Sequence, residues 1–246
     1  FAILGTRMRD REPEEGNSTN LMKDVLDGLR YTLAHDATRL VLVLSFCVAL
    51  FARPYMDLLP GYALAVFDHG TDGVGTMFAA SGIGALCFSV FMALRGRTEG
   101  LTKLLIVSSA AASIALLLYA VSPNFWLAGI FMAFVGGGLV VVGIASQSLI
   151  QHATSNEFQA RVISVYFALT FGVLAIGVLV MGWIAEFAGF RVSFACGAAL
   201  SLLIVLVIGP GLWRRAGDLE DPKAEFRPPP VTGSAITDAK SSRTAD

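Results

Sequence analysis

Across its 246 residues the chain is 55% hydrophobic and only 15% charged, which is more apolar than a soluble domain of this length. Its formal net charge of −1 argues against a nucleic-acid partner, whose phosphates would select a strongly basic face. The composition therefore indicates a membrane protein.

The charged residues are concentrated at the two ends of the chain. Of the 37 Asp, Glu, Lys and Arg residues, 13 lie in residues 1–39, 12 in residues 214–246 and 12 in the 174 residues between. We therefore expect three parts: a cytoplasmic linker over 1–36, a six-span transmembrane domain over 37–213 and a disordered cytoplasmic tail over 214–246. Within the linker, Leu21, Val25, Leu29 and Leu33 recur every four residues and predict an amphipathic helix at the inner membrane surface.

The first predicted span, 40–67, is long and contains unusual residues. As a continuous helix it would measure about 42 Å, whereas the hydrocarbon core is about 30 Å thick. It must therefore tilt, bend or protrude. Pro54 and Pro60 lack the N–H that a helix needs and weaken it at those points. Irregular backbone at this depth requires protein or a water-filled cavity around it.

Arg53 and Asp57 lie in the same span, four residues apart, so a continuous helix would place them on one face as an ion pair. Two interpretations are open. In the first the residues have no functional role: the pair is a structural salt bridge, or Arg53 extends to the interface because the span ends near Leu59. In the second the pair lines a central cavity. In the cavity interpretation Arg53 attracts an anionic or polar group and Asp57 is its exchangeable partner. Both residues are candidates for the substrate or ion pathway.

Five further apolar stretches predict spans over 74–94, 104–121, 125–150, 162–187 and 192–213. Small residues recur in them, in AASGIGA, in GGG with Gly143, and at Gly172, Gly177 and Gly182. They indicate close helix packing, with sliding helices as the alternative. The three cysteines, Cys47, Cys87 and Cys196, each stand alone in an apolar stretch. We expect them to be buried, without a metal or disulfide role.

The end of the fourth span and the start of the fifth carry polar residues. Gln147 and Gln151 share a helix face and are expected at the bundle interior or the membrane interface, as further pathway candidates. Thr154 and Glu157 fit a capping box that places Arg161 on the first turns of the fifth span.

The basic residues predict the orientation. With both termini inside the cell, 16 of the 18 Lys and Arg residues lie on the cytoplasmic side, as the positive-inside rule requires. Arg191 is then in an outer loop and Arg53 within a span.

Four stretches resemble a known family: DGLRYTLAHD before the first span, LLPGYA within it, AASGIGAL in the second, and the pattern Q-x5-E-x3-R-V-x-S from Gln151 to Ser164. They resemble the C-terminal half of the major facilitator superfamily, in the branch of enterobactin-type and drug exporters called transmembrane secretion effectors. The resemblance covers about residues 20–210. Two features depart from the family: Gln159 and Ala160 replace an Arg-Gly pair, and the loop RGRTEGLTK lacks an acidic residue of the gating motif.

This resemblance implies an all-α membrane protein with six transmembrane helices forming half of a major-facilitator bundle. It implies secondary export of a small molecule, such as a drug or siderophore, across the bacterial inner membrane by alternating access with ion or proton coupling. It also implies no cofactor, a partner half of six N-terminal spans from the same gene or a split gene, and an inner gate at Glu157 and Arg161.

Other functional classes are less well supported by the sequence. The histidines lie at or beyond the span ends and no H-E-x-x-H or G-x-S-x-G motif occurs, so an enzyme is not expected. A six-span oligomeric channel or receptor subunit is the alternative, because identical subunits in a ring enclose a pore.

Overall fold

The computed structural model describes residues 36–67, 69–96, 100–152 and 159–217, and in these the regular structure is entirely helical. The elements are α2 (Asp36–Phe51), α3 (Tyr55–Tyr62), the π-helix η1 (Ala63–Phe67), α4 (Gly70–Arg95), α5 (Leu101–Val121), α6 (Phe125–His152), α7 (Gln159–Ala188) and α8 (Phe190–Arg214). They form 6 stretches long and apolar enough to cross a membrane, which confirms the all-helical six-span prediction. The predicted ends of the last five spans differ from the helix ends by a few residues at most.

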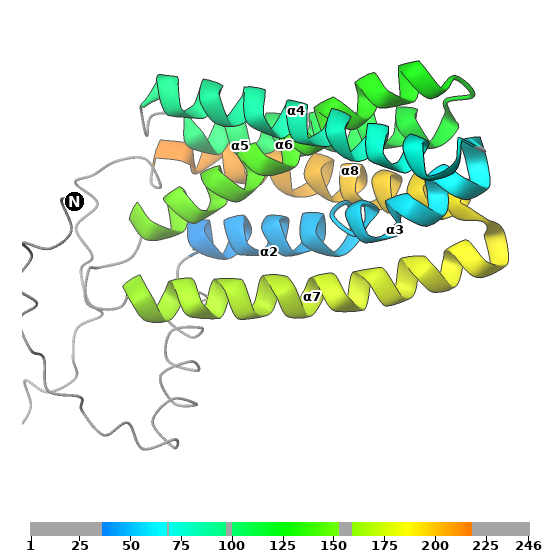
Figure 1. Cartoon of the computed structure of the whole chain (residues 1–246). Coiled ribbons are helices and arrows are strands. Elements are labelled where there is room, and N and C mark those ends of the chain that lie inside the picture. The colour runs from blue at the N-terminus through cyan, green and yellow to red at the C-terminus, as the bar shows by residue number, and fades with distance from the viewer. Residues whose placement is uncertain (1–35, 68, 97–99, 153–158, 218–246) are drawn as a thin grey trace, which may run out of the picture.

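The first span contacts α4, α6, α7 and α8. Within it, α2 lies between α6 and α7 and also contacts α8, whereas α3 contacts α4, α7 and α8; α4 and α5 pack against α6 (Figure 1). Helices α4 and α7 are the most outlying: in each, 17% of the most apolar stretch is buried, against 39% to 50% in the other spans. A large part of their apolar surface therefore faces away from the described bundle.

Glycines allow α4 and α6 to approach closely. A Cβ added to Gly84 would overlap the backbone carbonyl of Ala133, and one added to Gly136 would overlap Ser81. Such contacts are typical of membrane helices, where close backbone approach drives association. The predicted packing role is confirmed at these glycines, whereas a Cβ on Gly143 or Gly172 would meet open space.

Hydroxyl groups also join the helices. Ser113 of α5 and Ser201 of α8 are hydrogen-bonded over 2.8 Å, and Ser193 of α8 donates to the carbonyl of Met181 on α7 over 2.6 Å. At one end of the bundle, Tyr62 donates to the carbonyl of Ala120 over 3.1 Å. These bonds satisfy buried polar groups where lipid offers no partners.

The prediction that the cysteines are buried is wrong for two of the three. Cys87 and Cys196 are exposed, and Cys47 is half-buried. The physical reason is that a bilayer-facing surface is itself apolar, so no hydrophobic effect drives a small apolar side chain to the interior.

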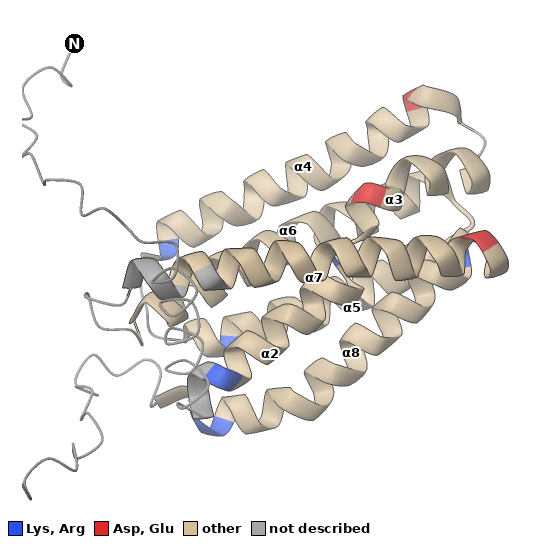
Figure 2. Ribbon diagram, turned by 90° about the horizontal axis from the view of Figure 1, so that it is seen from below, with Lys and Arg blue, Asp and Glu red and all other residues tan. Residues whose placement is uncertain are grey.

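Charge is distributed unequally between the two ends of the bundle. Most of the described Lys and Arg residues gather at one end, whereas Asp72 and Glu186 belong to helix ends at the other (Figure 2). Lys103 lies over the ring of Trp213, 5.1 Å from its centroid, at the basic end. Trp126 and Trp183 are exposed near the opposite end, as expected for aromatic residues at a membrane interface.

Three predictions lie wholly or mostly outside the described residues: the amphipathic helix of the linker, the Thr154 and Glu157 capping box, and the tail beyond residue 217.

Candidate functional site

The first span is interrupted at its midpoint. A turn over residues 52–54 separates α2 from α3, within a span that runs from Arg39 to Phe67. Because Pro54 has no N–H, the hydrogen bonding changes: the N–H of Arg53 donates to the carbonyl of Val48 over 3.0 Å, and that of Asp57 to the carbonyl of Pro54 over 3.2 Å. The predicted weakness at Pro54 is confirmed, whereas Pro60 lies inside α3 and the π-helix η1 follows it.

This turn separates Arg53 from Asp57. Both residues are exposed, and within the described part of the chain no ion pair joins them. The spacing of four residues brings side chains together only in a continuous α-helix, and the turn interrupts that helix. The predicted pairing of the two residues is therefore wrong.

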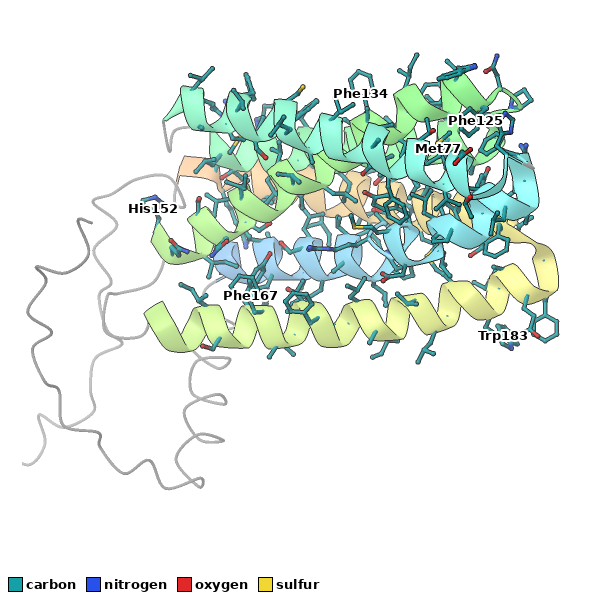
Figure 3. The ribbon with its side chains drawn as sticks, viewed as in Figure 1. Met77, Phe125, Phe134, His152, Phe167 and Trp183 are labelled. Carbon is teal, nitrogen blue, oxygen red and sulfur yellow. The ribbon has the colours of Figure 1, made fainter. Side chains whose placement is uncertain are left out.

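A cavity of about 400 Å³ opens beside the turn. Its walls come from the start of α3, the middle of α4, the second half of α6 and the first half of α7. Phe167 lies on the side of α7 that faces the rest of the bundle (Figure 3). The size and the mainly apolar, aromatic walls are typical of a site for a small organic molecule.

Polar groups stand at defined places in this apolar wall. The Tyr55 hydroxyl is hydrogen-bonded to Ser81 over 2.8 Å, which joins α3 to α4 at the cavity. The Tyr166 hydroxyl is buried close to Ser45, Ser146 and Thr170. Ser45 donates to Ser146 over 2.7 Å and so joins α2 to α6.

Thr170 differs from these paired hydroxyls. Its side chain is 5% exposed and its Oγ1 has no hydrogen-bond partner among the described residues. It lines both the large cavity and an adjoining pocket of about 20 Å³, in each case together with Arg53 and Tyr166. Thr170 therefore lies beside the Tyr166 hydroxyl without meeting the geometry of a hydrogen bond, and a ligand could satisfy it.

The structure brings some of the predicted site residues together and not others. Arg53 and Gln147 line the cavity. Asp57 is exposed on α3 and Gln151 is half-buried near the end of α6, and neither is among the cavity-lining residues. Glu157 lies outside the described residues. The backbone of Arg161 is in the first turn of α7, while its side chain is outside the description.

Comparison with known proteins identifies the family. The sequence matches the family described as transmembrane secretion effector over residues 1–239. The chain belongs to this family, a branch of the major facilitator superfamily. No solved structure matches it.

A curated relative of this chain is the uncharacterized MFS-type transporter YfmI of Bacillus subtilis (strain 168). The two are 20% identical over 198 residues, which cover 79% of this chain and 48% of the relative. The chain thus spans about half the length of the curated relative that it matches.

The sequence interpretation missed four residues that line the cavity: Tyr55, Ser81, Tyr166 and Thr170. Isolated hydroxyls are common in membrane helices, so none of them gave a distinctive signal. One signal was available, because Tyr166 and Thr170 are four residues apart and share a helix face.

Within the described residues, no three His, Cys, Asp or Glu side chains gather where a metal could bind.

Proposed function

We propose that this chain supplies one six-span half of a secondary transporter that exports a small molecule, such as a drug or siderophore, across the bacterial inner membrane. The observation that carries the proposal is the cavity beside the broken first span. Discontinuous helices at mid-membrane form the binding sites of many secondary transporters. Membership of a transporter family supports transport over catalysis.

The second half is proposed to complete the cavity from its open side. Arg53, Met56 and Phe171 are exposed there, while the poorly buried helices α4 and α7 flank the opening. Another six-span unit, from the same gene or a split gene, would cover these apolar faces as well as the cavity. Alternating access then requires the two halves to rock about the bound cargo.

The remaining site assignments belong to the same proposal. Arg53 and Gln147 contact cargo in the cavity, while Asp57 and Gln151 lie on the ion or cargo pathway outside it. Glu157 and Arg161 form the gate at the cytoplasmic end. Ion or proton coupling supplies the driving force.

An efflux experiment tests the proposed function. Cells that express the complete gene product are expected to accumulate less of at least one compound from a panel of toxic small molecules. They should also tolerate a higher concentration of that compound. Collapse of the proton gradient should abolish the effect, because coupling requires the gradient. This six-span chain alone should show no efflux. Stable unitary conductance in a planar bilayer, without gradient-dependent efflux, would instead favour the channel alternative.

The orientation gives a separate prediction. Both termini are proposed to be cytoplasmic, because the basic end of the bundle belongs on that side. In a variant with the three native cysteines replaced, cysteines at Thr71 and Asn124 should react in intact cells with a membrane-impermeant maleimide. A cysteine at Thr98 should react only after permeabilisation. Labelling at Thr98 in intact cells would reverse the assignment.

A further inference from the structure

Arg53 gives the cavity its electrostatic character. It is the one charged residue among the described residues that line the cavity, and no carboxylate lines the walls beside it. It lines the cavity together with Tyr55 and Tyr166, and no ion pair within the described residues neutralises it. A charge at this depth in a membrane protein is costly, and such residues characteristically mark a pathway for substrates or ions.

The polar groups near Arg53 favour an oxygen-bearing anion. A guanidinium donates several hydrogen bonds in a planar fork that matches a carboxylate, sulfonate or phosphate. Thr170 adds an unpartnered hydroxyl in the same two pockets. A cationic ligand would meet repulsion from Arg53 and find no carboxylate in these walls.

The rest of the wall excludes a small inorganic anion as the fitting occupant. The cavity of about 400 Å³ is lined by Phe78, Phe167 and Phe171 together with aliphatic side chains. An inorganic ion would leave most of this volume unfilled and would lose hydration without apolar contacts in return. A ligand with an aromatic or bulky apolar body buries that surface.

We propose that the cavity is selective for amphipathic organic anions, with the oxyanion group bound by Arg53 and Thr170 and the apolar body packed against Phe78, Phe167 and Phe171. This inference rests on the proposed transport function and adds the class of cargo.

The test uses three probes that share one naphthalene ring and differ in charge: 2-naphthoate, 2-naphthalenemethanol and 2-naphthylmethylammonium. Their binding to the detergent-purified complete gene product is measured by isothermal titration calorimetry. We expect 2-naphthoate to bind about tenfold more tightly than the alcohol, as one charge-assisted interaction supplies, and the ammonium to bind most weakly.

Variants assign the preference to its residues. Arg53→Gln should abolish the anion preference, so that 2-naphthoate binds to this variant no more tightly than the alcohol; detectable binding of the alcohol shows that the cavity is intact. Arg53→Lys should keep part of the preference, because the charge remains and the planar fork is lost. Arg214→Gln removes the same charge at the end of α8 and should keep all of it. Thr170→Val should weaken naphthoate binding more than alcohol binding.

Several results would overturn the inference: no binding of 2-naphthoate up to millimolar concentration, equal or tighter binding of the ammonium, or an anion preference that survives in Arg53→Gln. The efflux experiment distinguishes a failure of the organic-anion selectivity from a failure of the proposed transport function. Efflux of a cationic cargo without anion preference rejects the organic-anion class and leaves transport in place. Anion-selective binding without any efflux rejects transport and leaves the selectivity in place.

Discussion

Gly84→Leu is expected to remove most of the folded protein from the membrane. A Cβ at this position would overlap the carbonyl oxygen of Ala133 on α6. The close contact is mutual, because a Cβ added to Gly137 of α6 would lie 2.9 Å from the carbonyl oxygen of Gly84. The contact involves the backbone, so neither side can move aside by changing rotamer. We expect α4 to be forced away from α6 at a cost of about 3 kcal/mol.

The measurement is the amount of monodisperse protein after detergent extraction and size-exclusion chromatography, with thermal stability as a second readout. Gly75→Leu is the matched control, because it makes the same change on the same helix where a Cβ meets nothing within 4 Å. A surface change of this kind is usually within about 0.5 kcal/mol of neutral. Equal yields for the two variants would contradict a tight contact between α4 and α6.

Gly143→Phe is expected to abolish efflux while the amount of folded protein stays near normal. Gly143 lines the cavity and a Cβ there would meet no atom within 4 Å, so a ring can enter without displacing the helices. The added phenyl group occupies a substantial part of a cavity of about 400 Å³ and takes the place of the cargo. The loss should appear in both efflux and binding of 2-naphthoate.

Gly172→Phe controls for the added ring. Gly172 also offers open space to a Cβ, but it is not among the residues that line the cavity. It should therefore retain efflux. If Gly143→Phe exported as well as Gly172→Phe, the cavity would not be on the cargo pathway; if it failed to fold, the open space described at Gly143 would be contradicted.

The site was only partly predictable from the sequence. Arg53 stood out because a charge is rare within an apolar stretch, and the structure places it at the cavity. Gln147 was recognised because a neutral amide in or near hydrocarbon needs a polar partner. Asp57 was grouped with Arg53 on the assumption of a continuous helix, and the turn at 52–54 invalidates that assumption. Tyr166 and Thr170 could not be told from ordinary residues of a membrane helix. Their importance depends on which groups of other helices surround their hydroxyls, and the sequence does not show this.

The sequence by itself determined the all-helical class, the number of spans and, to within a few residues, the ends of the last five spans. The reason is that crossing a bilayer demands a long apolar stretch with its hydrogen bonds satisfied internally, and both demands are local properties of the chain. Only the tertiary structure decided which glycines meet backbone, which cysteines face outward and which polar groups share one cavity. These properties depend on contacts between helices far apart in sequence, and since lipid is as apolar as the helix surfaces, hydrophobicity does not distinguish an inward face from an outward one.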